Sequence, residues 1–145
     1  MDVRCVLLVP LLIGGCGPLV ERYDGHDYVF STDYQTWEGA QRDCASRGYH
    51  LADVEDAREN AWINAVASIY ESSLWWLGFN DRLEEGVWVW EGGFAGEFSD
   101  WSSGAPGDSD CTGLSAWFGG DTGESTGGIW HAEPCGEWFP YICER

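Results

Sequence analysis

The spacing of apolar residues changes several times along the chain, and each change marks a predicted element. Residues 28–30 alternate with polar neighbours, which predicts a first strand. From Thr36 the apolar residues recur at a helical period, and Gly48 is expected to end this helix. A second helix is expected from Asp56, which can cap it, to Tyr70. Its expected apolar stripe comprises Ala57, Ala61, Trp62, Ile63, Val66 and Ile69.

No helical period returns after the second helix. The apolar runs 75–79, 87–90, 128–130 and 139–143 suit short strands. Residues 94–128 are rich in Gly, Ser and Asp, which predicts long loops with short strand pieces. Two helices followed by strands and long loops predict one α+β domain.

The N-terminal residues form a region separate from this domain. The apolar run over residues 5–13 is far shorter than the roughly 20 residues that a membrane-spanning helix needs, and it is typical of an export signal. Residues 13–16 (Ile-Gly-Gly-Cys) also resemble a bacterial lipobox, in which Cys16 would be lipidated. We therefore expect a signal peptide over 1–15 and a short tether over 16–24. The product would be an outer-membrane or cell-surface lipoprotein, or a freely secreted protein.

The cysteines support export. Two of the six fall in the N-terminal region, which leaves an even number in the domain. In an exported chain this count predicts two disulfides, and spacing alone leaves three pairings open. A zinc site is the competing interpretation, but the three His residues do not fall at zinc-ligand spacings beside these cysteines. The four cysteines of the domain are Cys44, Cys111, Cys135 and Cys143.

Charge narrows the range of partners. The formal net charge is −18, and the chain has no lysine. Such a surface repels nucleic acid and anionic lipid, so neither is an expected partner, and the membrane would be reached only through a lipid anchor. Cations, in contrast, suit such a surface.

Several short motifs then follow one another in a recognisable order. They are Thr-Trp-Glu-Gly-Ala (36–40), His-Leu-Ala-Asp-Val (50–54), Trp-Leu-Gly-Phe-Asn-Asp (76–81), Glu-Gly-Val-Trp-Val-Trp (85–90) and Phe-Pro-Tyr-Ile-Cys (139–143). Together they resemble a short-form C-type lectin-like domain over residues 25–145.

The resemblance implies two helices with antiparallel sheets, a long loop region and a specific disulfide pairing. Cys44 would pair with Cys143, and Cys111 with Cys135. The tryptophans at family core positions would be buried: Trp76, Trp88, Trp90 and Trp130.

The resemblance also bears on calcium. In sugar-binding members, a Glu-Pro-Asn triplet and an Asn-Asp pair hold the ion that the sugar coordinates. The matching positions here are Ala105-Pro106-Gly107 and His131-Ala132, and Ser109 replaces a further carboxylate. Calcium needs six to eight oxygen ligands, which Ala and Gly side chains do not supply. Sugar binding through this ion is therefore not expected.

A second calcium position of the family keeps its acidic residues. Asp81, Glu85, Asp108 and Asp110 match it. Carboxylates brought together repel one another unless a cation lies between them. We therefore expect a structural calcium here that stiffens the long loop.

The resemblance implies a surface recognition module that binds a glycan or a protein through the long loop between Trp101 and Trp130. An enzyme is not expected, since the sequence indicates no nucleophile–base arrangement and the cysteines are expected in disulfides. Trp117, Phe118 and His131 are the candidate ligand contacts, with Trp75 and Trp138 as further exposed candidates. One alternative is a calcium-dependent lectin that uses noncanonical ligands such as Asp108, Asp110, Asp121 or Glu124. Another is a structural or adhesion protein.

Overall fold

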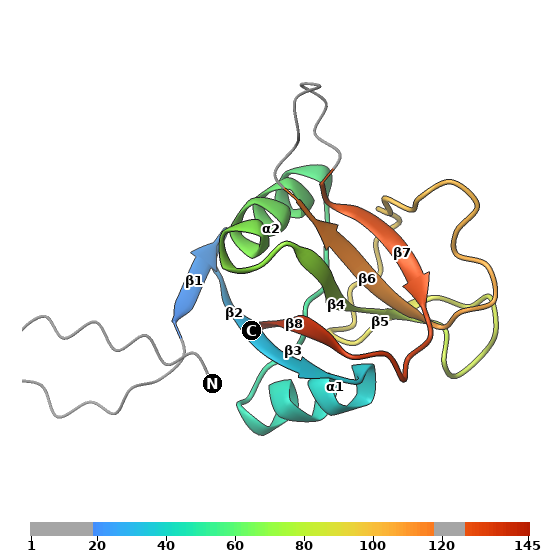
Figure 1. Cartoon of the computed structure of the whole chain (residues 1–145), viewed down its shortest axis with the longest axis horizontal. Helices are drawn as coiled ribbons and strands as arrows, with labels where there is room; N and C mark the ends of the chain where they lie inside the picture. The colour runs from blue at the N-terminus through green and yellow to red at the C-terminus, as the bar shows by residue number, and fades with distance from the viewer. Residues whose placement is uncertain (1–18, 118–126) are drawn as a thin grey trace, which may run out of the picture.

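A computed structural model describes residues 19–117 and 127–145 (Figure 1). The predicted signal peptide, Cys16 and Phe118 lie outside this part of the chain. Within it, no helix is long and apolar enough to cross a membrane. The elements are β1 (Val20–Tyr23), β2 (His26–Gln35), α1 (Trp37–Ser46), β3 (His50–Leu51), α2 (Ala57–Tyr70), β4 (Ser73–Asn80), β5 (Val89–Trp90), β6 (Cys111–Ala116), β7 (Ile129–Glu133) and β8 (Phe139–Glu144).

The strands form one 8-stranded sheet with the order β1-β2-β8-β4-β6-β7. β3 adds to β8 and β5 adds to β4. All pairings are antiparallel except that of β4 with β8, where Trp76 lies opposite Tyr141. The predicted α+β class is confirmed. Because β2 and β8 are neighbours, the two ends of the domain lie side by side (Figure 1).

Both helices begin where the sequence predicts. The Thr36 hydroxyl accepts the Gly39 N–H at 3.1 Å, and the Asp56 carboxylate accepts the Glu59 N–H at 2.9 Å. Each cap satisfies one of the free N–H groups of a first helical turn. The Glu59 carboxylate accepts the N–H of Glu55 at 2.6 Å and the hydroxyl of Tyr28.

The predicted apolar stripe of α2 is wrong in part. The buried residues of this helix are Glu59, Asn60, Ile63 and Ala67, whereas the Ile69 side chain is 74% exposed. The reason is that two polar side chains of α2 have buried partners on the sheet. Tyr28 is the partner of Glu59, and Trp130 is the partner of Asn60. These contacts rotate the inward face away from the one that apolarity alone indicates.

The ordered domain begins before the predicted boundary at residue 25. Residues 20–23, expected to lie in a tether, form β1 and pair with β2. Asp24 and Gly25 make the turn, both at positive φ (47° and 87°), and such backbone favours Asp-Gly. Tyr23 stacks on Trp62 of α2 with ring centroids 4.8 Å apart, which fixes the hairpin to the core.

β6 is the strand that the sequence indicates least clearly. It lies between β4 and β7, one strand in from the edge of the sheet, within residues 94–128, where long loops with only short strand pieces were expected. Its Gly and hydroxyl residues interrupt the apolar alternation, although Cys111, Thr112, Gly113 and Leu114 are all buried.

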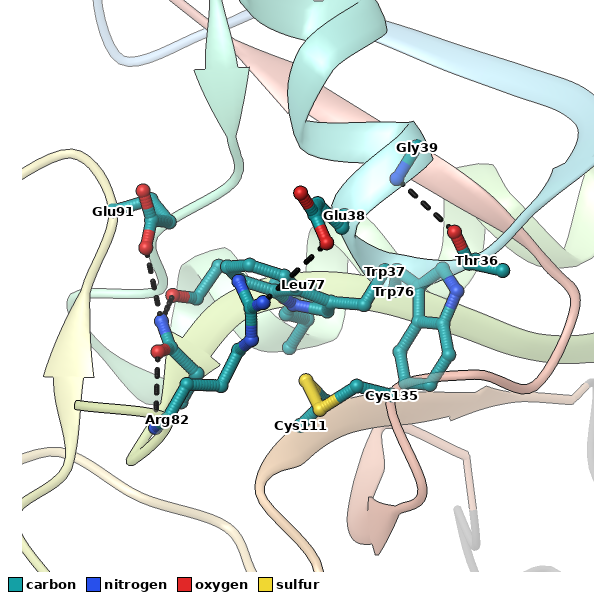
Figure 2. Close-up of a disulfide and its surroundings, with 12 residues drawn as sticks. Thr36, Trp37, Glu38, Gly39, Trp76, Leu77, Arg82, Glu91, Cys111 and Cys135 are labelled. Carbon is teal, nitrogen blue, oxygen red and sulfur yellow. Dashed lines mark hydrogen bonds and ion pairs between the residues drawn. A yellow bond between two sulfur atoms is a disulfide. The ribbon is translucent and has the colours of Figure 1, made fainter. Parts of the chain in front are cut away.

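The two disulfides have the pairing that the family resemblance implies. Cys44 pairs with Cys143 and joins α1 to β8, with a Cα–Cα distance of 5.4 Å. Cys111 pairs with Cys135 and joins β6 to the turn before β8 (Cα–Cα 5.3 Å). Figure 2 shows the second disulfide beside Trp76, in the core layer under α1.

Candidate functional site

Three of the four predicted calcium ligands come together at one end of β4. Ligand oxygens of Asp81, Glu85 and Asp110 all lie within 4.8 Å of one another. Asp81 directly follows β4, Glu85 lies in the turn before β5, and Asp110 directly precedes β6. The Asp81 N–H donates to the Asp110 carbonyl at 3.1 Å, so the pairing of β4 with β6 sets their separation. We call these three residues the loop carboxylates.

Asp108 lies outside this group. It is exposed, and its ligand atoms are not among those that converge. Asp110 is held by its backbone bond to Asp81. The charge of Asp108 nevertheless contributes to the electrostatics of the site, because it acts on Glu85.

The electrostatics of the loop carboxylates favour a cation. The charge of Asp81 is the main cause that raises the pKa of Glu85, with smaller contributions from desolvation and from Asp110 and Asp108. Asp81 is only 2% exposed. Its Oδ2 accepts the Gly86 N–H at 2.8 Å, whereas Oδ1 is buried without a hydrogen-bond partner in the described part of the chain. A buried carboxylate oxygen without a partner is costly, and a metal ion would satisfy it.

The donor set fits calcium. Carboxylate oxygens are hard ligands, and calcium accepts several of them in flexible geometry together with water. No Cys or His belongs to the group of three, which removes the softer donors that zinc prefers.

The usual sugar-coordinating positions of the family differ. Ala105 and Gly107 lie in the loop between β5 and β6, and His131 and Ala132 lie on β7 opposite Gly113 and Thr112. None of these four side chains has a carboxylate or amide oxygen. That sugar does not bind through a calcium ion at this position therefore remains a prediction.

The candidate aromatic contacts differ in exposure. Trp117 follows β6 and is 52% exposed, and Trp138, before β8, is 58% exposed. The Trp117 N–H donates to the Asn64 side chain at 3.2 Å, which fixes its backbone on α2. Trp75 is different: it is fully buried, and its indole N–H donates to the Glu71 carbonyl at 3.0 Å. The interpretation of Trp75 as an exposed candidate is therefore wrong, because this face of β4 packs under α2.

Asn60 is a positioning residue that the sequence analysis missed. It lies on α2 and is 5% exposed. Its Nδ2 donates to the Gly128 carbonyl at 2.8 Å and to the Asp100 carboxylate at 3.1 Å, and its Oδ1 accepts the Trp130 indole N–H at 2.9 Å. One side chain thus holds both ends of the long loop against the helix. The feature of the sequence that could have indicated this role is a polar residue one turn after the Asp56 cap, where the helix would otherwise bury an apolar side chain.

A cluster of aromatic rings packs beneath the long loop region, between the loop and the sheet. Phe79 contacts Trp90, Trp101 and Trp130 with ring centroids 4.3, 5.8 and 5.8 Å apart. Trp88 packs edge-on against Trp101 at 4.8 Å. Offset and edge-to-face rings of this kind add stability beyond their buried area. Of the four tryptophans predicted for the core, Trp76, Trp90 and Trp130 are buried, whereas Trp88 is only half-buried.

Comparison with known proteins identifies the family of this fold. Residues 33–145 match the family model for the lectin C-type domain. Lectin BRA-3 of Megabalanus rosa is 32% identical over 86% of this chain and 74% of its own length. The versican core protein of Rattus norvegicus is 27% identical over 86% of this chain but only 4% of its own length.

Among solved structures, the mouse scavenger receptor C-type lectin carbohydrate-recognition domain superposes with a TM-score of 0.75 at 25% identity. The superposition covers 90% of this chain and 98% of that domain. None of these three names describes an enzyme.

Proposed function

We propose that this chain, which belongs to the lectin C-type domain family, is an extracellular recognition module that binds a glycan through its long loop region. The observation that carries the proposal is that the acidic residues of one calcium position of the family are present, whereas those of the sugar-coordinating position are not. The loop carboxylates converge, whereas the sugar-coordinating positions at Ala105, Gly107 and His131-Ala132 lack side-chain carboxylate and amide oxygens. The glycan would therefore be held without coordination to the usual calcium ion. Binding, not catalysis, is the role that this difference supports.

Calcium, in this proposal, has a structural role. Asp81, Glu85 and Asp110 would hold it, and the ion would supply positive charge between β4, the turn before β5 and the strand start of β6. Its effect would be to stiffen the loop, since the ligands come from three separate segments.

The glycan contacts proposed here are Trp117 and His131, with Phe118 as a further prediction beyond the described residues. The exposed indole of Trp117 can stack on the apolar face of a sugar ring while its edge remains hydrated. Half-buried His131 on β7 can donate or accept a hydrogen bond with a sugar hydroxyl.

Export of the chain is part of the proposal. The support is the apolar run over residues 5–13 together with two disulfides, which persist in oxidising compartments. We propose anchoring through a lipid on Cys16, with free secretion as the other outcome. Metabolic labelling with a fatty acid, lost in Cys16→Ser, tests the anchor.

A second candidate function is calcium-dependent sugar binding through noncanonical ligands. The exposed carboxylate of Asp108 favours it, because a ligand bridging Asp108 and the loop carboxylates would share their ion.

The deciding experiment is binding of the purified chain to a broad glycan array, in millimolar calcium and again in chelator. Binding that survives the chelator supports the proposal. Binding abolished by the chelator, with Asp108→Asn equally inactive in calcium, supports the second candidate. No binding in either condition contradicts both and leaves a protein ligand or an adhesion role.

A further inference from the structure

A second acidic cluster lies where β8, the last strand of the domain, pairs with β2 and β3. Glu144 on β8 is 2% exposed, Glu59 on α2 is 6% exposed and Asp53, between β3 and α2, is 4% exposed. Each accepts hydrogen bonds from the protein. We call these three residues the core carboxylates.

Register places Glu144 at the centre of this cluster. On β8 it lies opposite Tyr28 of β2 on one side and opposite His50 of β3 on the other. Its Oε2 accepts the Asp53 N–H at 2.8 Å, and its Oε1 lies 2.6 Å from Nδ1 of His26. His26 is the first residue of β2, directly after the β1–β2 turn. The contact thus joins the N-terminal hairpin to the C-terminal strand.

The surrounding charges are mostly negative. Glu144 faces Glu59 from α2, Asp53 from the β3–α2 connection, and the imidazoles of His26 and His50. His26 in turn is within the field of Glu144, Glu55 and Glu59. His50 lies 3.8 Å from Asp53. Tyr28 donates its hydroxyl to Glu59 and stays protonated, since burial raises its pKa far above the usual range.

We propose that His26 and Glu144 form a proton-dependent clamp that holds the N-terminal hairpin to the C-terminal strand in mildly acidic surroundings and weakens as the pH rises. Protonated His26 is the cation that this buried carboxylate contacts directly. Loss of that proton leaves Glu144 charged, buried and next to two further carboxylates, which is a costly arrangement.

The sign of the effect follows from linkage. Burial lowers the pKa of His26, but the hydrogen bond and charge of Glu144, with Glu55 and Glu59, outweigh it, so the pKa lies above the usual 6.5. Burial is the first cause that raises the pKa of Glu144, Glu59 and Asp53 above their usual values. All four groups therefore bind protons more tightly in the folded state than in the unfolded state. Stability from each is present below its unfolded pKa and is lost as the pH rises through its folded pKa.

The test is denaturant unfolding of the full chain in chelator, at several values between about pH 5.5 and pH 8.5, so that calcium binding does not contribute. We expect the wild-type midpoint to fall across this range. In His26→Gln, which cannot be protonated, the fall should shrink, and Glu144→Gln should shrink it as well. The control is Ser68→Ala on α2, which removes a side-chain hydrogen bond to the Asn64 carbonyl but no titratable group, and which should keep the wild-type slope.

A second measurement tests the proposal on the wild-type chain and does not depend on whether the variants fold. Nuclear magnetic resonance titration of wild-type His26 should give a pKa above 6.5, and Glu144→Gln, if folded, should lower it. A wild-type slope in His26→Gln, or a His26 pKa at or below 6.5 in the wild-type chain, would overturn the proposal.

Discussion

The carboxylate of Asp81 accepts the Gly86 N–H through Oδ2 at 2.8 Å, while Oδ1 of the same group is buried without a partner in the described part of the chain. Gly86 lies in the turn that also carries Glu85. The hydrogen bond therefore fixes the turn around a carboxylate oxygen for which residues 19–117 and 127–145 supply no hydrogen-bond donor. Oxygens of Glu85 and Asp110 lie within 4.8 Å of those of Asp81, so a cation could bind at this oxygen, as the proposed calcium site requires.

Calcium should raise the thermal stability of the chain, and Asp81→Asn should abolish the effect. At about a hundredfold excess of free calcium over its Kd, binding to the folded state contributes roughly 2.7 kcal/mol and raises the Tm by roughly 10 °C. Differential scanning fluorimetry in calcium and in chelator measures this shift. Asp108→Asn is the control, because Asp108 is exposed and outside the converging group, and it should keep most of the shift. An unchanged Tm for the wild-type chain in calcium would contradict the site.

The sequence predicted those parts of the fold that depend on local chemistry or on the family motifs. Thr36 and Asp56 cap their helices because a side-chain oxygen next to free N–H groups acts within one turn. The disulfide pairing came from the resemblance and not from spacing, which left three pairings open.

Sequence-based prediction failed where contacts between residues far apart in the chain, and not the local pattern of apolar residues, decide which side chains are buried. Ile69 is exposed because Glu59 and Asn60 of the same helix have buried partners on the sheet, and no local pattern announces those partners. β6 was expected only as a short strand piece because Gly113 and the Gly, Ser and Asp residues around it interrupt the apolar alternation, although β4 and β7 pair with it on both sides. Asp108 and Asp110 are equivalent in the sequence, but only the second is held by a backbone bond to Asp81.

Asn60→Ala should destabilise the chain by about 2–3 kcal/mol, because the Trp130 indole N–H and the Gly128 carbonyl would lose their buried partner. Chemical denaturation in urea measures the loss. Asn64→Ala is the matched control one turn further along α2, where the contacts with Trp117 are exposed, and it should cost under about 1 kcal/mol. Equal losses in the two variants would contradict the role of Asn60 in holding the loop.

The two disulfides should contribute unequally. The Cys44–Cys143 bond closes a loop with a sequence separation of 99 and the Cys111–Cys135 bond one of 24. The chain-entropy relation gives about 4.7 kcal/mol for the first and about 3.5 kcal/mol for the second. Paired Cys→Ala variants, compared by denaturant unfolding without reductant, measure the difference. A larger loss from removing Cys111–Cys135 would mean that its contacts with the Trp76 layer, and not loop closure, dominate.

Trp117→Ala should weaken glycan binding at least about tenfold while leaving the Tm nearly unchanged, because an exposed indole that anchors a ligand contributes to binding and little to the core. The ligand is the strongest binder found on the array, and isothermal titration calorimetry gives the Kd. Trp138→Ala is the matched control: it is similarly exposed, at 58% against 52%, but lies before β8 and outside the loop region. Equal weakening by both variants would indicate a nonspecific aromatic effect. Weakening by Trp138→Ala alone would move the binding surface from the long loop to the turn beside the Cys111–Cys135 disulfide.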